Sequence, residues 1–299
     1  MTHVLTLVAG AAEGRLGPSV PAAAQAALAG AGARVGMPDW LAPGIACDLA
    51  YAADDPAAAH AAAALALAPA AIDVLATPVA GRRRRLLVCD MEATVVENEL
   101  LDDMAALAGL GDAVAAVTRR AMAGEIDFAA SLRHRTRLFA GYGEALLAAA
   151  ARGIRPVAGA RTLVATMRRS GALTALVSGG FSIFVDRVRA ELGFDLGFAN
   201  RLAWDGDLLT GEVAELAITA EGKRATLERL AAERHLSTAE AVAIGDGAND
   251  LAMLAAAGLA VGFRPKPPVA AAVANRIVHS DLTAVLYLQG YRPAEFAAG

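Results

Sequence analysis

Two apolar segments of this sequence end in carboxylates, at Asp90 and at Asp246. The first segment, 86–89, runs directly into Asp90, and Glu92 follows two positions later. The second segment, 241–244, leads into Asp246 through a glycine. A buried strand that ends in an acid delivers that acid to the rim of a parallel sheet, where open α/β folds place their chemistry. Asp90 is therefore a candidate nucleophile, and the two acids predict a shared divalent cation that offsets their repulsion.

The segment that begins at Gly245 has the composition of a metal-binding turn. Its glycines let the backbone turn tightly while Asp246, Asn249 and Asp250 converge. Oxygen ligands at a phosphate site favour Mg²⁺ over transition metals. The five histidines show no pairing at metal-ligand spacing, so zinc is unsupported. The sequence predicts Mg²⁺ here, and the alternative is an ordinary polar turn.

A phosphate site is predicted from two further features that lie between the acidic segments. The apolar run 173–177 leads into Ser178, Gly179 and another glycine. A hydroxyl and free backbone N–H groups at the entry to a helix cradle phosphate well. Lys223 lies in a helical stretch and is expected to steady the phosphate and to hold Asp90 ionised. Each feature alone has an ordinary explanation, a common turn in one case and a solvated charge in the other.

The elements that position these residues predict an α/β protein of several units. Helix and strand alternate beyond residue 156, which predicts a doubly wound parallel-sheet, Rossmann-like core made of residues 82–96 and 156–299. Apolar residues at helical spacing predict a helical cap, inserted over the active site, at residues 97–155. Residues 1–81 predict a small α+β domain, in which strand and helix alternate around a broken middle.

Four consecutive arginines, at positions 82–85, follow the first of these units. Adjacent cations repel one another and prefer water. We therefore expect a solvated linker here, and the alternative is a phosphate-binding patch.

The composition excludes several classes of partner. The net charge of −4 provides no concentrated positive field for nucleic acid or anionic lipid. The longest apolar stretch, 61–72, has twelve residues and contains a proline, which is too short to cross a bilayer. The first twenty residues lack the pattern of a secretory signal, and two cysteines are too few for a disulfide framework. We expect a cytoplasmic protein with a small-molecule substrate, and homodimer formation stays open.

The order Asp, Ser, Lys, Asp resembles the four-motif layout of the haloacid dehalogenase superfamily, whose phosphatases form an aspartyl-phosphate. A more specific resemblance, over about residues 86–285, is to the phosphoserine phosphatases of that superfamily. Residues 1–80 resemble only loosely the degenerate ACT-type N-terminal domain of bacterial members. The closer resemblance is carried by the segments 90–94, 98–99, 121–124 with Phe128, 131–135, 177–181, 198–202 and 245–250.

The resemblance implies a Mg²⁺-dependent enzyme that hydrolyses O-phospho-L-serine through an aspartyl-phosphate at Asp90. Glu92 would be the general acid/base and would give its backbone carbonyl to Mg²⁺, with Asp246 as the other protein ligand. The substrate's ammonium would bind Glu99 and its carboxylate Arg135. The remaining implied residues are the apolar wall formed by Met122 and Phe128, the phosphate site formed by Ser178, Gly179 and Lys223, and the supporting pair Asn249 and Asp250.

The sequence departs from the family at two adjacent positions. The family has Asp and Ser where this chain has Glu92 and Ala93. Because Glu is one methylene longer, its carboxyl is expected to position water differently. A related phosphoserine:homoserine phosphotransferase also has Glu at this position, so transfer to an alcohol is the alternative reaction. A catalytically weak amino-acid sensor is the alternative outside enzymes.

Overall fold

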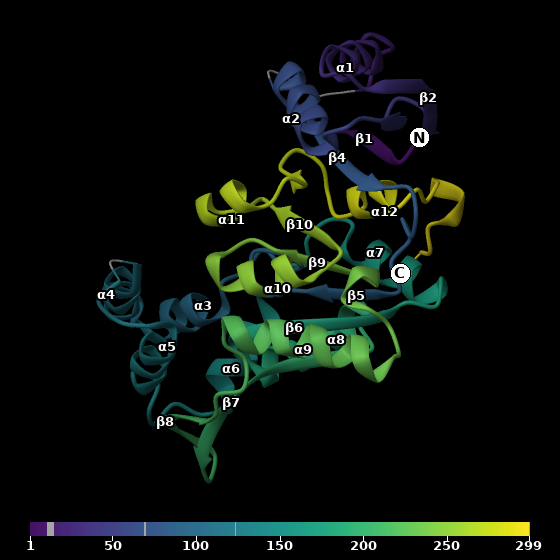
Figure 1. Cartoon of the computed structure of the whole chain (residues 1–299). Coiled ribbons are helices and arrows are strands. Elements are labelled where there is room, and N and C mark those ends of the chain that lie inside the picture. Colours follow the sequence, from purple (N-terminus) through teal and green to yellow (C-terminus); the bar gives the residue numbers. More distant parts are fainter. Residues whose placement is uncertain (11–14, 69, 123, 299) are drawn as a thin grey trace.

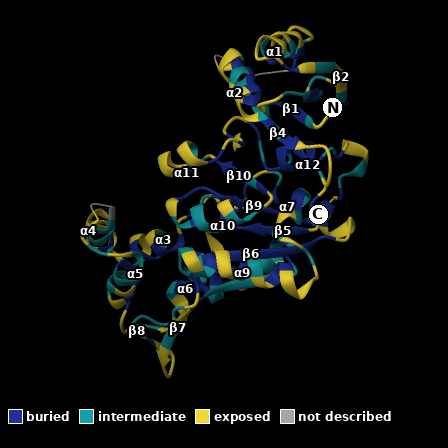
Figure 2. Cartoon of the chain, in the orientation of Figure 1, coloured by how far each residue is buried: buried dark blue, intermediate teal, exposed yellow. Residues whose placement is uncertain are grey.

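The computed structural model describes residues 1–10, 15–68, 70–122 and 124–298. These residues form an N-terminal unit, a central α/β core and a helical cap, which lie at the top, middle and lower left of Figure 1. The central strands of both sheets are largely buried, whereas exposed residues lie on the outer sides of the helices and on edge strands such as 34–42 and 208–215 (Figure 2).

The N-terminal unit has the strand and helix order β-α-β-β-α-β that is typical of ferredoxin-like sandwiches. Its antiparallel sheet has the strand order β2-β3-β1-β4. The residues expected to be a broken middle form β2 and β3. The edge strand β2 contains Pro38 and two irregularities of register, which obscure the alternation typical of a strand. The ACT-type resemblance of this unit stays a prediction. The elements are β1 (His3–Ala9), α1 (Ser19–Gly30), β2 (Arg34–Ala42), β3 (Ala46–Ala52), α2 (Pro56–Leu67) and β4 (Ile72–Pro78).

The core is a seven-stranded sheet with helices on both faces, which confirms the predicted fold class. The strand order is β11-β10-β9-β5-β6-β7-β8, and each neighbouring pair is parallel except β7 and β8. The strands are β5 (Leu86–Cys89), β6 (Leu173–Phe181), β7 (Leu196–Asp205), β8 (Leu208–Glu215), β9 (Ala241–Gly245), β10 (Leu259–Phe263) and β11 (Arg276–Ile277). The helices are α7 (Ala160–Arg169), α8 (Ser182–Leu192), α9 (Ala220–Glu233), α10 (Leu251–Ala256), α11 (Pro267–Ala272) and α12 (Ala284–Leu288).

The register of the central strands brings the predicted active-site residues to one edge. Cys89, the last residue of β5, pairs with Ile244 of β9 on one side and with Leu176 of β6 on the other. The chain after each of these strands therefore emerges at the same edge of the sheet. Strand β5 is fully buried, as expected for a central parallel strand covered on both faces.

The cap consists of helices that lie between β5 and α7 in the sequence. The hairpin β7–β8, predicted from its glycine turn, extends from the sheet towards this cap (Figure 1). Gly141 donates to the Leu209 carbonyl, and Leu209 donates to the Tyr142 carbonyl, both at 2.8 Å. The cap helices are α3 (Leu100–Ala108), α4 (Gly111–Met122), α5 (Phe128–Arg137) and α6 (Glu144–Arg152).

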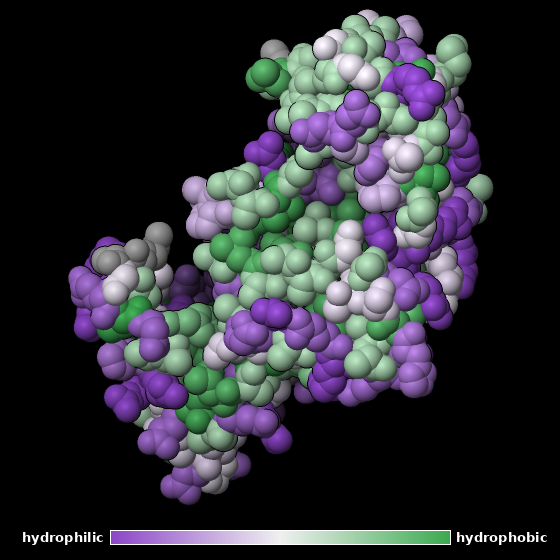
Figure 3. All heavy atoms as spheres, in the orientation of Figure 1, coloured by the Kyte–Doolittle hydropathy of each residue, from purple (hydrophilic) through white to green (hydrophobic). Residues whose placement is uncertain are grey.

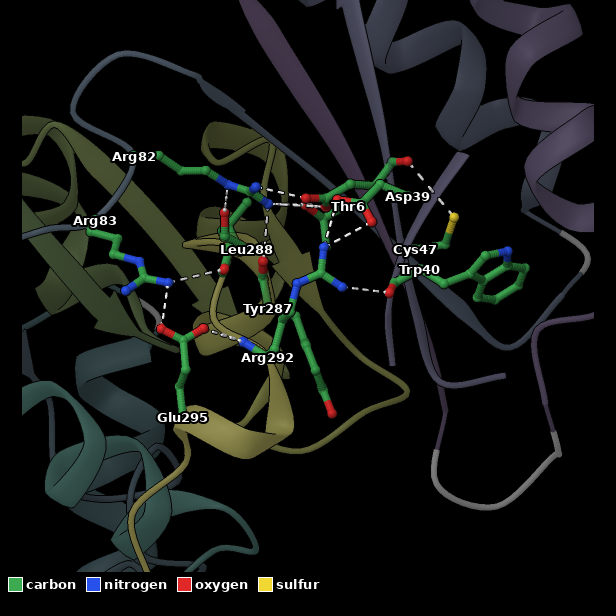
Figure 4. A network of polar contacts seen from close by, with 12 residues as sticks. Thr6, Asp39, Trp40, Cys47, Arg82, Arg83, Tyr287, Leu288, Arg292 and Glu295 are labelled. Atoms are coloured by element: carbon green, nitrogen blue, oxygen red, sulfur yellow. Dashed lines mark hydrogen bonds and ion pairs between the residues drawn. The ribbon is translucent and has the colours of Figure 1, made fainter. Parts of the chain in front are cut away.

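The prediction of a solvated linker at residues 82–85 is wrong for two of the four arginines. Arg82 donates to both carboxylate oxygens of Asp48 at 2.6 and 2.9 Å and to the carbonyls of Tyr287 and Leu288 at 3.0 and 2.8 Å (Figure 4). Arg82 is partly buried, and Arg84 is buried. Because the alternate residues 83 and 85 are exposed, the four cations do not crowd one another, and the segment joins the N-terminal unit to the core.

A groove separates the N-terminal unit from the core on the face shown in Figure 3. The apolar side chains on its walls include Ala64, Ile72 and Val74 on one side and Pro265 and Val278 on the other. Across the described ranges of the chain, the helices are all too short or too polar to cross a membrane.

Candidate active site

Three buried carboxylates meet at the edge of the core sheet where β5 and β9 end. Asp90 follows β5, and Asp246 and Asp250 belong to the turn after β9. Carboxylate oxygens of all three residues lie within 4.8 Å of one another. The two strands thus bring together acids that are more than 150 positions apart in the sequence, as the sequence predicts.

Lys223 lies among these carboxylates and is itself buried. Its Nζ atom is 2.5 Å from Oδ1 of Asp90 and 2.6 Å from Oδ1 of Asp250. Burial favours the neutral amine, but the two carboxylates outweigh it and raise the pKa of Lys223 above its usual value. Burial and the neighbouring Asp250 raise the pKa of Asp90, and the Lys223 ammonium opposes that shift. Lys223 is therefore a permanent cation that favours the ionised form of Asp90.

The two acids of the second turn have different surroundings. Asp250 accepts hydrogen bonds through Oδ2 from the backbone N–H groups of Asp246 and Gly247, both at 3.1 Å, and Lys223 holds its other oxygen. A Cβ atom at Gly245 would lie 2.5 Å from the Asp250 carboxyl, so only glycine fits there. Asp250 braces the turn, whereas Asp90 and Asp246 line the adjacent pocket. An oxygen-only set of this kind suits a hard divalent cation.

The predicted phosphate loop lies beside Asp90. Ser178 is buried, and its Oγ atom accepts a hydrogen bond from the Gly180 N–H at 2.9 Å. Gly179 and Gly180 line the pocket, whereas Ser178 and Lys223 are buried and are not among its lining residues. Asn200 belongs to the segment 198–202 of the sequence resemblance, which implies no role for it. Its buried side chain donates to the Gly179 carbonyl at 2.9 Å and to the Ile218 carbonyl at 3.1 Å, and so joins this loop to the segment before α9.

The cap supplies the opposite wall of the pocket. Glu99, Phe128 and Arg135 line it. The Nε atom of Arg135 is buried and has no hydrogen-bond partner among the described residues, although buried donors usually have one. Phe128 lies against the phosphate loop, since a Cβ atom at Gly179 would lie 2.8 Å from the ring. The side chain of Met122, the other predicted wall residue, lies outside the described part of the chain.

Glu92 and Asn249 also line the pocket. Oε1 of Glu92 accepts a hydrogen bond from the Leu100 N–H at 2.7 Å. Burial, with a contribution from the nearby Glu99 carboxylate, raises the pKa of Glu92 to about 7. A carboxyl group with that pKa can both donate and accept a proton near neutral pH.

Lys266 lines the same pocket but was not predicted from the sequence. Its Nζ atom is 3.0 Å from Oδ2 of Asp246 and 3.2 Å from Oε1 of Glu99. It therefore joins the proposed metal site to the cap. The rarity of lysine is a sequence feature that could have identified it, because Lys223 and Lys266 are the two lysines of the whole sequence.

Comparisons with known proteins agree with this geometry. The haloacid dehalogenase-like hydrolase family matches residues 87–255. The phosphoserine phosphatase of Lactococcus lactis is 39% identical over 201 residues, which cover 67% of this chain and 93% of that protein. The phosphoserine phosphatase of Streptomyces coelicolor is 40% identical over 227 residues, which cover 76% of this chain and 55% of that protein. This chain thus spans about half the length of the Streptomyces relative.

A solved structure extends the likeness to the N-terminal unit. The unliganded probable phosphoserine phosphatase of Vibrio cholerae superposes with a TM-score of 0.79 at 27% identity, covering 98% of this chain and 88% of that one. The family match and the Lactococcus relative carry the assignment. The chain belongs to the haloacid dehalogenase-like hydrolases and, within them, to the phosphoserine phosphatase family.

Proposed function

We propose that the protein is a Mg²⁺-dependent phosphatase that hydrolyses O-phospho-L-serine to L-serine and inorganic phosphate. The observation that carries the proposal is the arrangement of charge in one pocket. Asp90 and the glycines of the phosphate loop line one wall, and the cap lines the other with one acid, Glu99, and one base, Arg135. A zwitterionic amino-acid phosphate needs an anion, a cation and a phosphate site, and Arg suits a carboxylate because its planar fork bonds both oxygens.

The metal is proposed to be held by Asp90, by Asp246 and by the backbone carbonyl of residue 92. Buried oxygen donors fit this role, because two neighbouring carboxylates need cationic charge to remain ionised. When bound, Mg²⁺ supplies positive charge that shields the phosphate from the attacking carboxylate.

The reaction is proposed to proceed in two steps. A carboxylate oxygen of Asp90 attacks phosphorus, the bond from phosphorus to the serine oxygen breaks, and Glu92 gives its proton to that oxygen. Water then attacks the aspartyl-phosphate, and Glu92 takes a proton from the water, so that Asp90 and phosphate are released. Lys223 would stabilise the transferring group and keep Asp90 ionised throughout.

The test is release of inorganic phosphate from L-phosphoserine by the full chain, with Mg²⁺ and with a chelator. Release should require the metal. Asp90→Asn keeps the shape but removes the attacking charge, so turnover should fall by several orders of magnitude. Asp246→Asn should raise the Mg²⁺ concentration needed for half-maximal rate. Near-normal turnover by pure Asp90→Asn, or metal-independent turnover by the wild type, would contradict the proposal.

Glu92 favours one second candidate, transfer of the phosphoryl group from phosphoserine to an alcohol such as homoserine. Its side chain is one methylene longer than the aspartate of the family resemblance, and its carboxyl accepts a hydrogen bond from the Leu100 N–H at the start of the cap. We further propose a cytoplasmic location, because Cys47 and Cys89 are both free thiols.

A further inference from the structure

Lysine is rare in this chain and is confined to the active site. The sequence has 27 basic residues of the Lys and Arg types, and all but Lys223 and Lys266 are arginine. Lys223 touches Asp90 and Asp250, and Lys266 touches Asp246 and Glu99. An ammonium is a compact point charge, whereas a guanidinium is a planar fork that binds carboxylates through two bonds. A chain that otherwise uses arginine therefore has a compact ammonium at two places where a cation meets the acids of the pocket.

Lys266 differs from Lys223 in its exposure and in its attachment. The Lys223 side chain is 1% exposed, while that of Lys266 is 55% exposed. The backbone of Lys266 is anchored, because its N–H donates to the Asp246 carbonyl at 2.8 Å. Its ammonium is thus held next to Asp246 but stands at an open side of the pocket, where it can be replaced.

Of the two carboxylates that contact Lys266, Glu99 is the one from which its ammonium can be displaced. This residue precedes α3, the first cap helix, and its side chain is half exposed. The ion pair between Lys266 and Glu99 therefore joins the core to the cap. Under the proposed function, Glu99 binds the ammonium of the substrate, so the Lys266 ammonium and that of the substrate share one carboxylate.

We propose, resting on the proposed function, that the Lys266 ammonium pairs with the Glu99 carboxylate when no substrate is bound. When the amino-acid group of the substrate binds, its ammonium displaces that of Lys266 from Glu99. Lys266 is then a specificity-determining residue. It keeps Glu99 paired when no amino acid is bound. It also lowers the affinity of the site for every ammonium-bearing ligand, including the product L-serine. An arginine would hold Glu99 through two bonds and would be released less readily.

The first test is calorimetric binding of L-serine to the Mg²⁺-loaded full chain. Lys266→Met should bind L-serine about two- to fivefold more tightly than the wild type, the range expected for removal of one partly exposed competing ion pair. Glycerate, which has a hydroxyl in place of the ammonium, should bind both proteins equally. In a Glu99→Gln background, Lys266→Met should have no effect on L-serine. Unchanged or weaker L-serine binding by Lys266→Met would overturn the proposal, and weaker binding would mean that Lys266 contacts the ligand itself.

A matched control removes a neighbouring cation that lies outside the pocket. Arg264 is exposed, two positions before Lys266, and its guanidinium lies 5.0 Å from the centre of the Phe263 ring. Arg264→Met should leave L-serine binding unchanged. If Arg264→Met tightens L-serine binding as much as Lys266→Met, the effect is one of general charge and the proposal fails.

A second readout separates this proposal from the proposed function. Reductive ¹³C-methylation labels amines and keeps their charge. The ¹³C-methyl NMR signal that is absent from labelled Lys266→Arg is assigned to Lys266. Glu99→Gln should shift this signal whether or not the protein acts on phosphoserine, and L-serine should shift it in the wild type. A wild type that neither hydrolyses phosphoserine nor binds L-serine refutes the proposed function, whereas an unmoved signal in Glu99→Gln refutes the pairing itself.

Discussion

The carboxyl group of Glu92 accepts a hydrogen bond from the backbone N–H of Leu100, the first residue of cap helix α3, at 2.7 Å. The first N–H groups of a helix lack partners within the helix, and Glu99, at the capping position, makes no capping bond in the described structure. Glu92 therefore caps the helix that begins beside the proposed ammonium site. The position of the proposed acid/base thus depends on the position of the cap.

The pKa of Glu92 makes the rate of the first step depend on pH. Burial raises this pKa to about 7, so the protonated form that is needed to protonate the leaving serine oxygen predominates below pH 7 and is lost above it. We expect kcat/KM for phosphoserine to fall as pH rises through about 7. The profile should be measured between about pH 5 and 9.

The control for this profile is Glu92→Gln, which should be nearly inactive because an amide cannot exchange the proton. Its residual kcat/KM should not fall near pH 7. The substrate's own phosphate titrates near pH 6 and affects every variant alike. A wild-type profile that matches the Glu92→Gln profile in shape would show that Glu92 does not cause the fall of kcat/KM near pH 7.

Shortening Glu92 tests the role of its extra methylene. Glu92→Asp restores the family residue and should leave hydrolysis unchanged or raise it, because its carboxyl then stands at the distance that positions water in relatives. With added homoserine, the wild type should form more phosphohomoserine per free phosphate than Glu92→Asp does. Both products can be measured by ³¹P NMR. A wild type that forms no phosphohomoserine, together with a Glu92→Asp variant that hydrolyses much more slowly, would mean that the longer acid is adapted to water.

Selectivity for an amino acid is predicted to depend on Arg135. Its buried Nε has no partner among the described residues, so a substrate carboxylate would complete its hydrogen bonds. Arg135→Ala should raise KM for phosphoserine about 10- to 100-fold, the range for loss of a charged hydrogen-bonded contact. O-Phosphoethanolamine keeps the ammonium but lacks the carboxylate, so its kinetics should change little. Equal losses for both substrates would mean that Arg135 has a structural role.

The attachment of the N-terminal unit is predicted to depend on Arg82. Removal of this side chain leaves the buried Asp48 carboxylate without its cation, and burial already raises the pKa of Asp48. Arg82→Met should lower the free energy of unfolding by about 3 kcal/mol, as for other broken buried pairs. The matched control is Arg83→Met, whose pair with Glu295 is exposed and should cost less than about 1 kcal/mol. Urea denaturation measures both, and equal losses would contradict the burial argument.

The sequence alone determined those parts of the site that depend on local pattern. Apolar runs that end in Asp90 and Asp246 predicted two central parallel strands, and the structure places both acids at one edge. Gly245 is needed where the Asp250 carboxyl approaches the backbone. Such features can be read from a single sequence, because strand burial and tight turns restrict which residues fit at each position.

Only the tertiary structure decided which charges meet. Lys266 and Glu99 are 167 positions apart, and no local pattern in the sequence pairs the two. The same holds for Arg82, whose partner Asp48 lies on β3 of the N-terminal unit, and for Asn200, which joins two loops. Whether a polar side chain is solvated, paired or buried depends on the surfaces packed against it, and those surfaces come from distant segments that only the folded chain brings together.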